Sequence, residues 1–445
     1  MGSVPIFGTP PGPRSLIPGR FLRLMQRDPI PFLQRLAAEY GDASSFHIGP
    51  QRVIFVNHPD LIREVLVTQA RFFHKSPLLH RAKPVFGEGL LTSEDELHRR
   101  QRRLAQPAFH RDRIERYAQV MSDRAAALAD SWRDGDTVDI HAEMMRLTLA
   151  VVAKTLFDAD IEGEAAEIGA ALKTLIDDFP RLMNPYAEML RMLPLPWSRR
   201  LERAIARLDR TIYSIIEERR RSGEDRGDLL SMLLLALDEE GDRSGMSDKQ
   251  VRDETMTLFL AGHETTANAL AWTFTLLSQH AAIAQELQRE VDALGATPGA
   301  ADYPRLTFTA QVLAESMRLY PPAWAVSRLA LQDLTIGAWS VPRGSVVLMA
   351  QAITHRDPRF WPEPDAFDPH RFTPQAKTAR PRLAYFPFGA GPRTCIGEGF
   401  AWMEGVLILA TLAQKWRMEL RSTPRPQASI TLRPRGGIAM RLVRR

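Results

Sequence analysis

The sequence predicts a mainly α-helical protein with small β-sheets. Apolar residues recur at helical spacing over long stretches, for example residues 112–132 and 198–221. Runs with high β-propensity are short and cover residues 52–57, 334–351 and 429–443. With 44% hydrophobic and 25% charged residues, the composition is that of a globular protein with a large core. No internal repeat or low-complexity linker divides the chain, so we expect one domain over residues 1–445, with residues 1–20 as a proline-rich lead-in.

The strongest helix signal begins at a capping box formed by Ser247 and Gln250 and runs from Val251 to about Gln279. At 1.5 Å per residue, such a helix is about 40 Å long and can cross a whole domain. It is the best candidate for a central helix of the fold.

The centre of this helix, AGHETT at residues 261–266, is more polar than its surroundings. Its threonine hydroxyls can bond to carbonyls one turn earlier, which would explain them without any function. Glu264 is different, because burying a carboxylate costs free energy. Such a residue is expected at a buried position only where a function needs it. We therefore expect a polar role at this point.

Cys395 lies in FGAGPRTCIG, just before a helical pattern of apolar residues at Phe400, Met403, Leu407 and Ala410. A lone cysteine is commonly a small buried hydrophobe. At a helix N-terminus, however, the partial positive charge favours the thiolate. The neighbouring glycines, at positions 389, 391 and 397, permit tight turns and would let a flat ligand lie close to the backbone. The pattern indicates a thiolate beneath a planar cofactor.

We expect neither a secretory signal nor a membrane span. The first residues lack a basic start followed by an apolar core. The longest stretch without formal charge, Thr265–Gln285, could span a bilayer by length but contains polar residues throughout. A single cysteine cannot form an internal disulfide, which fits a reducing cytoplasm.

The net charge of +5 is concentrated in basic runs such as residues 98–103 and 219–221. Such runs occur in nucleic-acid-binding proteins, yet no zinc-finger spacing or RNA-binding signature accompanies them. We expect solvated helix faces or a docking surface for an acidic protein, and no nucleic acid.

The stretch FGAGPRTCIG matches the heme-binding signature of the cytochrome P-450 family, Phe-x-x-Gly-x-Arg-x-Cys-x-Gly, at every fixed position. This resemblance implies the cytochrome P-450 fold, in which heme b (iron protoporphyrin IX) lies between the long central helix and the cysteine-loop helix. It implies that Cys395 is the axial ligand of the iron, that Phe388 packs near the sulfur, and that Arg393 meets a heme propionate. An anionic thiolate ligand pushes electron density toward the iron and favours O–O cleavage.

Other family motifs follow in the expected order. ESMR supplies Glu315 and Arg318 on one helix face, and FDPHRF supplies Arg371, which in the family completes a buried Glu–Arg–Arg cluster. The family's usual Glu before that arginine is His370 here. We expect the cluster to serve folding and heme retention, because losing one partner of a buried ion pair costs about 3–5 kcal/mol.

The resemblance also implies a cationic grip on the heme propionates. His98 and Arg102 lie one turn apart in HRRQRR, and Arg328 lies in WAVSRLA. The motif AGHETT matches the family's oxygen-binding kink, where Ala261 and Gly262 would leave room above the iron. There Thr265 would hold dioxygen and water, and Glu264 would relay protons.

The sequence thus resembles a heme-thiolate monooxygenase that inserts one atom of O2 into a lipophilic small molecule, by hydroxylation or epoxidation. Electrons would come from NAD(P)H through a separate ferredoxin or flavodoxin and its reductase, docking near the basic residues Arg99, Arg100 and Arg103. A peroxide-driven peroxygenase is an alternative, although such relatives often replace the acid–threonine pair. A non-enzymatic heme or lipid carrier is another, but it would not need Glu264 and Thr265.

By resemblance, the substrate pocket is lined by almost entirely apolar residues, which suggests a fatty acid, terpenoid or polyketide. The expected lining residues are Val85, Phe86, Phe259, Ala323, Val326 and Ile438.

Overall fold

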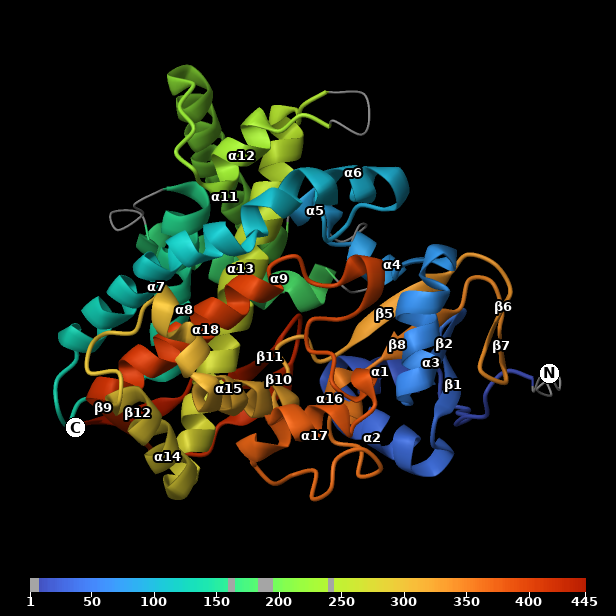
Figure 1. Ribbon diagram of the computed structural model, residues 1–445. Coiled ribbons are helices and arrows are strands. Elements are labelled where there is room, and N and C mark those ends of the chain that lie inside the picture. The colour runs from blue at the N-terminus through green and yellow to red at the C-terminus, as the bar shows by residue number, and fades with distance from the viewer. Residues whose placement is uncertain (1–7, 159–164, 183–194, 239–243) are drawn as a thin grey trace. The chain divides into compact units, whose positions relative to one another are not determined.

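The computed structural model describes residues 8–158, 165–182, 195–238 and 244–445. Contacts divide the chain into two compact units, and each unit is assembled from three separate segments (Figure 1). The sheet unit comprises Met1–Pro77, Ala314–Cys395 and Pro426–Arg433, and the helical unit comprises Leu78–Leu313, Ile396–Arg425 and Pro434–Arg445. The expectation of one domain over residues 1–445 stays a prediction.

The sheet unit is built on a five-stranded sheet of order β1-β2-β8-β5-β3. β2 runs parallel to β8, and the other neighbours are antiparallel. A tight turn through Gly49, whose φ is +58°, joins β1 to β2. The strands of this unit are β1 (Ala43–Ile48), β2 (Gln51–Val56), β3 (Phe73–Lys75), β5 (Val326–Ala330), β6 (Leu334–Ile336), β7 (Trp339–Val341) and β8 (Val346–Met349).

Both faces of this sheet are buried, which is why β2 is apolar without alternation. Ile54 and Val56 pack on one face against a cluster that includes Ile62. Val53 and Phe55 point the opposite way, as successive strand residues must, into a second cluster beneath α2. The helices of this unit are α1 (Arg20–Arg27), α2 (Pro29–Tyr40), α3 (Pro59–Arg63), α16 (Gln351–Thr354) and α17 (Pro374–Thr378).

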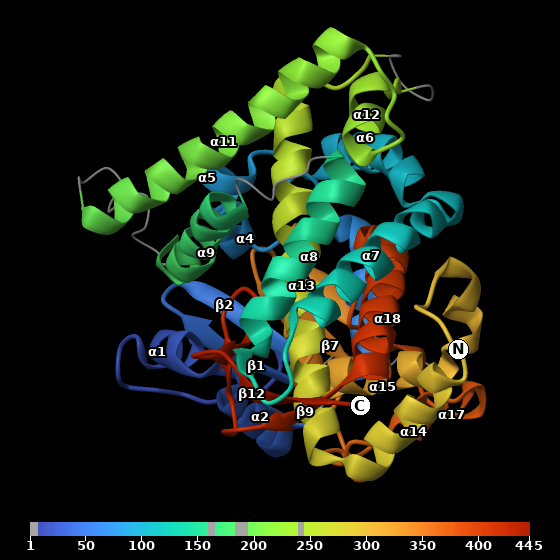
Figure 2. The same cartoon turned by 90° about the vertical axis from the view of Figure 1, so that its left-hand side faces the viewer.

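The helical unit is organised around α13 (Asp248–Gln279), as the sequence predicts. Both halves of the capping box are present: Ser247 Oγ accepts the Gln250 N–H, and Gln250 Oε1 accepts the Ser247 N–H. Figure 2 shows α8 and α11 beside this helix. The other helices are α5 (Lys83–Phe86), α6 (Asp95–Ala105), α7 (Arg111–Ser131), α8 (Ile140–Phe157), α9 (Ala165–Leu182), α11 (Pro196–Ser222), α12 (Leu229–Leu235), α14 (Ala281–Asp292) and α18 (Glu398–Lys415).

A small sheet of order β4-β12-β9 completes the helical unit. Its strands are β4 (Thr137–Asp139), β9 (Trp416–Leu420) and β12 (Ala439–Arg444). Four elements run across the division between the units along the chain: α4 (Pro77–His80), α15 (Thr307–Leu319), β10 (Arg425–Ala428) and β11 (Leu432–Arg435). Among the described residues, no helix combines the length and apolarity needed to cross a bilayer. The predicted mainly α fold with small sheets is confirmed.

Candidate active site

The loop that carries Cys395 lies in the sheet unit and is held by hydrogen bonds between its own backbone groups. The Cys395 N–H donates to the carbonyl of Phe388 (2.9 Å), and the Thr394 N–H donates to the carbonyl of Gly391 (3.0 Å). The Cys395 side chain is exposed. The loop therefore presents its thiol outward while its backbone bonds are satisfied internally.

Glycine is required at Gly391 for two reasons. Its φ of +72° lies in the left-handed region, and a Cβ there would come 1.9 Å from the carbonyl oxygen of Leu66. Gly389 also has positive φ, at +74°. Gly397 differs: its φ of −89° is open to any residue, and it serves as the N-cap of α18. Gly397 thus lies in a turn, as expected, but in one that does not require a glycine.

Helix α18 begins three residues after Cys395, where the sequence places it. Its predicted inward residues are buried, and they are Phe400, Met403, Leu407 and Ala410.

Glu315, Arg318 and Arg371 form a buried cluster in the sheet unit. Arg318 binds Glu315 through two hydrogen bonds of 2.6 and 2.8 Å, and both side chains have 0% exposure. Arg371 Nε lies 3.6 Å from Glu315 Oε1. Arg318 also donates to the carbonyls of His355 and Pro364, at 2.9 and 2.6 Å. The cluster ties α15 to the segment before Cys395, and its role in heme retention stays a prediction.

In the helical unit, α13 exposes a patch at its centre. From Val251 to Leu277 every residue is buried except Ala261, Gly262 and Thr265, which lie on one helix face. These residues have small side chains, so a flat group can approach the helix closely here. The patch fits a planar group such as heme.

The polar residues of this helix centre keep α-helical geometry. Thr265 Oγ1 donates to the carbonyl of Ala261 (2.7 Å), and Thr266 Oγ1 donates to that of Gly262 (3.4 Å). Glu264 is buried, at 5% exposure. A Cβ at Gly262 would come 3.2 Å from Val152 Cγ2, so this glycine also allows close packing against α8. The helix is continuous through AGHETT, and the expected kink is not a break in it.

The residues predicted to bind the propionates are divided between the units. His98 and Arg102 lie one turn apart on α6; His98 is buried, and its Nδ1 is 3.4 Å from Ser93 Oγ. Arg328 lies in β5, and Arg393 ends the short helix Gly391–Arg393; both are half-buried. Their role toward heme stays a prediction.

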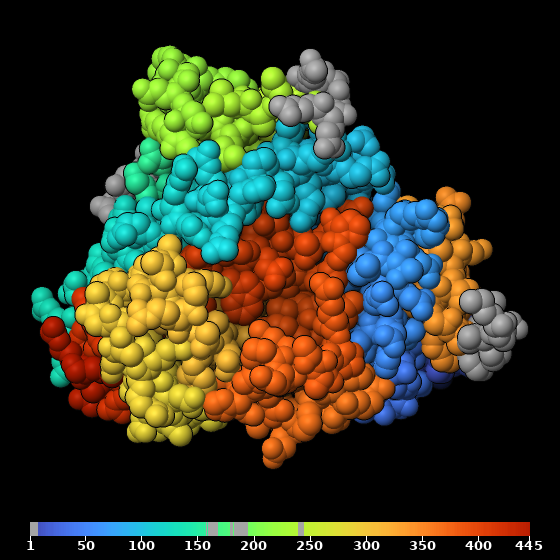
Figure 3. All heavy atoms as spheres, in the orientation of Figure 1, coloured from blue at the N-terminus to red at the C-terminus, as the bar shows by residue number. Residues whose placement is uncertain are grey.

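The basic run on α6 carries less free charge than the sequence suggests. Arg100 and Arg103 both pair with the buried Asp238, at 3.3 and 3.2 Å. Arg99 is exposed and pairs with Glu96 at 2.6 Å. Although α6 and α7 are open to solvent in Figure 3, in cyan, only part of the run's charge is available to attract a partner.

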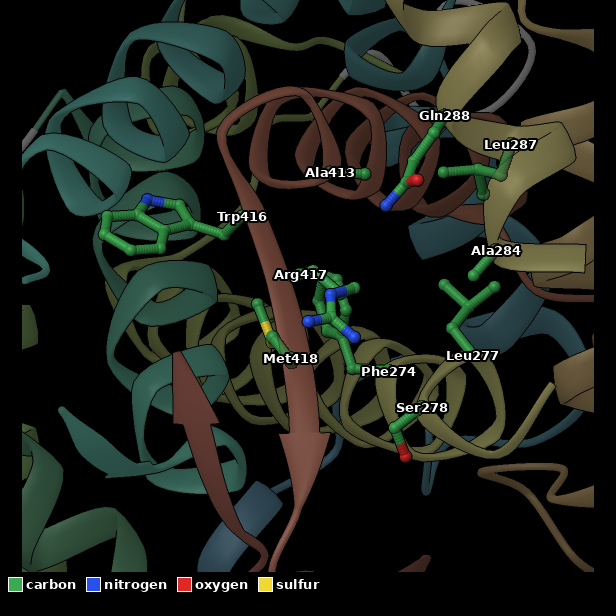
Figure 4. Close-up of a pocket in the computed structure, with 10 residues that line it drawn as sticks. All are labelled: Phe274, Leu277, Ser278, Ala284, Leu287, Gln288, Ala413, Trp416, Arg417 and Met418. Atoms are coloured by element: carbon green, nitrogen blue, oxygen red, sulfur yellow. The ribbon is translucent and has the colours of Figure 1, made fainter. Parts of the chain in front are cut away.

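The residues expected to line the substrate pocket also belong to both units. Val85 and Phe86 in α5, Phe259 in α13 and Ile438 are all buried in the helical unit, where α5 packs against α13. The other two, Ala323 and Val326, lie half-buried in the sheet unit. A separate hollow at the ends of α13 and α18, lined by Phe274, Leu277, Ala413 and Met418 among others, contains none of the predicted site residues (Figure 4).

Glu404 is a buried acid that the sequence analysis missed. It lies in α18 at 0% exposure, and burial raises its pKa to about 8, which the nearby Thr266 hydroxyl only partly opposes. The signal was available: Glu404 is the one charged residue in the apolar stretch from Phe400 to Ala413.

Comparisons with known proteins identify the family of this chain. The profile of the family described as Cytochrome P450 matches residues 10–440. Cyclooctatin synthase of Streptomyces melanosporofaciens is 41% identical over 92% of this chain and 91% of the relative. Cyclooctat-9-en-7-ol 5-monooxygenase of the same organism is 38% identical over 92% and 89%. Pentalenene oxygenase of Streptomyces avermitilis is 35% identical over 99% and 98%.

Among solved structures, the crystal structure of the cytochrome P450DA heme domain matches with a TM-score of 0.89 and 28% identity, covering 99% of this chain and 98% of that chain. These matches show that the chain belongs to the cytochrome P-450 family and is a heme-dependent monooxygenase.

Proposed function

We propose that this monooxygenase hydroxylates or epoxidises a cyclic terpene-type hydrocarbon or alcohol. The observation that carries the proposal is the open patch of α13, which follows directly after buried apolar residues such as Phe259. Two relatives similar to this chain are named for cyclooctat-9-en-7-ol and pentalenene, which supports a cyclic, mostly apolar substrate over a linear one.

We assign the following roles to this chain's residues, and their positions support the assignment. Heme, when bound, supplies the centre at which dioxygen is activated, and Cys395 is the residue that would ligate its iron. Thr265 lies on the open patch, where its Oγ1 can exchange the bond to the Ala261 carbonyl for a bond to water. Glu264, one residue earlier and buried, can hand a proton to that water.

The reaction balances with two electrons and two protons. One oxygen atom enters a C–H or C=C bond of the substrate, and the other leaves as water. We assign the electrons to NAD(P)H through a ferredoxin or flavodoxin and its reductase, and the setting to the cytoplasm. An acidic donor would be drawn chiefly to Arg99 of α6, because its ion pair with Glu96 is exposed on both sides, whereas the buried Asp238 compensates Arg100 and Arg103.

Difference spectra of the heme-loaded protein test the substrate class. Pentalenene and cyclooctat-9-en-7-ol should each shift the heme spectrum and, with ferredoxin, reductase, NADPH and 18O2, give a product carrying one labelled oxygen. Laurate serves as the linear control. A shift and a labelled product with laurate alone would refute the terpene assignment. Product formed with peroxide but not with reductase would indicate a peroxygenase instead.

A further inference from the structure

The segment after α5 is fastened to the first half of α13 by two consecutive buried carboxylates. Asp253 Oδ2 accepts the N–H of Glu88 (2.9 Å), and Glu254 Oε2 accepts the N–H of Leu90 (3.0 Å). Asp253 has 2% exposure and Glu254 has 0%. Neighbouring residues on a helix point about 100° apart, so the segment must wrap across the helix to meet both.

Two glycines let the segment lie this close. A Cβ at Gly87 would come 2.1 Å from the carboxylate of Asp253, and Gly87 has a left-handed φ of +58°. A Cβ at Gly89 would come 2.3 Å from Thr257 Oγ1 and 2.6 Å from the carbonyl oxygen of Asp253. No other residue type fits at either position without moving the segment away from α13.

One guanidinium joins this contact to a third helix. Arg252, at 7% exposure, donates from Nη1 to Asp253 Oδ1 (3.0 Å) and to the carbonyl of Val85 in α5 (3.1 Å). The same guanidinium binds Asp209 of α11, with Nε to Oδ1 at 2.7 Å. Figure 2 shows α11 crossing α13 at this end of the unit. The Arg252 side chain therefore couples the position of α11 directly to the Val85 carbonyl.

We propose that Asp209, Arg252 and Asp253 form a latch that holds Val85 and Phe86 in place and controls how fast ligands enter and leave the substrate pocket. This inference rests on the proposed function in one respect: it takes Val85 and Phe86, which the family resemblance implies as lining residues, to form part of the wall of the substrate pocket. Phe259, expected to line the same pocket, lies seven residues after Arg252 and so about 10 Å further along the same face of α13. The latch residues are positioning residues, because they act through α5.

Asp209→Asn is the gentlest test, because Asp209 is partly exposed, at 30%, and its loss leaves the Arg252–Asp253 pair intact. Arg252→Lys is the second variant, since a lysine keeps the charge but cannot reach Asp209, Asp253 and Val85 together. The matched control is Arg220→Gln. Arg220 pairs with Asp248 (2.6 Å) and also links α11 to α13, but within the described residues this pair forms no hydrogen bond with α5.

Two measurements on the heme-loaded protein decide the proposal. Amide hydrogen exchange over residues 83–92 should be about tenfold faster in both latch variants, as expected for losing a charged hydrogen bond, and unchanged in Arg220→Gln. Stopped-flow binding of 4-phenylimidazole to the heme should show association and dissociation both accelerated in the latch variants, with little change in affinity.

Unchanged exchange over residues 83–92 in both latch variants would overturn the latch. Faster exchange with unchanged 4-phenylimidazole kinetics would overturn it as well, by removing the segment from the ligand path. Neither readout depends on the natural substrate. If terpenes fail to turn over while both latch effects are seen, the proposed substrate class fails and the latch stands.

Discussion

Replacing Glu404 with Gln should stabilise the protein at alkaline pH and leave it almost unchanged at acidic pH. Glu404 is fully buried in α18, and neither carboxylate oxygen has a hydrogen-bond partner among the described residues. The Thr266 hydroxyl, which lies near it, gives its bond to the carbonyl of Gly262. Burial therefore raises the pKa of this acid from 4.5 to about 8 in the folded protein.

The sign and size of the effect follow from linkage. Below pH 4.5 the carboxyl is protonated in both the folded and the unfolded chain, so it does not weaken folding. Between pH 4.5 and 8 the unfolded chain loses the proton while the folded protein keeps it, so stability falls as pH rises. A shift of 3.5 pKa units, from 4.5 to 8, corresponds to a loss of at most about 5 kcal/mol. A neutral Gln of the same shape avoids this loss.

Urea unfolding followed by far-UV circular dichroism at pH 5 and pH 8 measures the effect. The free energy of unfolding obtained for Glu404→Gln should exceed that of the parent by several kcal/mol at pH 8 and by much less at pH 5. Glu398→Gln, an exposed acid in the first turn of the same helix, is the control and should show no such pH dependence. If Glu404→Gln lowered stability at pH 8, the acid would have to be ionised and well solvated in the folded protein, and the reasoning from burial would be refuted.

Three further outcomes are expected. Cys395→Ser should abolish the red-shifted Soret band of the reduced carbon-monoxide complex and all oxygenase turnover, since the chain holds a single cysteine; survival of the band would place the iron ligand elsewhere. Thr265→Ala should keep consuming NAD(P)H while the ratio of product to NAD(P)H falls and hydrogen peroxide rises; an unchanged ratio would leave Thr265 as a helix residue bonded to its own backbone. Glu315→Gln should cost about 3–5 kcal/mol of stability, because it leaves Arg318 buried without a counter-charge, whereas Asp365→Asn, at an exposed ion pair, should cost less than about 1 kcal/mol.

The elements that could be predicted from sequence are those with a long local pattern. α7, α11 and α13 lie within a few residues of the expected ranges, because amphipathic spacing and end caps are encoded within each helix. The run 334–351 was recognisably β-rich, yet it forms three strands in two different sheets. β6 and β7 make their own hairpin, while β8 pairs with β2 almost 300 residues away. Strand partners depend on long-range packing, which a local pattern does not contain.

The candidate site shows the same distinction. Cys395 with its glycines, the Glu315–Arg318 spacing and AGHETT are short motifs, so the sequence could single them out. The pairing of Arg100 and Arg103 with Asp238 could not be foreseen, because Asp238 is 135 residues from Arg103 and its burial depends on the fold. A charge run shows how many cations are present but not how many are already neutralised.

The residues that hold the site in shape were the hardest to foresee, and the first turns of α13 show why. In the sequence, RDE at residues 252–254 resembles the solvated start of a helix, where charged residues are common. In the structure all three are buried, because a segment some 165 residues earlier covers them. Its backbone N–H groups donate to Asp253 and Glu254, and its Val85 carbonyl accepts from Arg252. Those donors are main-chain groups, which leave no trace in residue identity apart from Gly87 and Gly89. Motifs therefore locate the chemistry of this enzyme, whereas the bonds that set access to it connect side chains to backbone over long distances and become visible only in the fold.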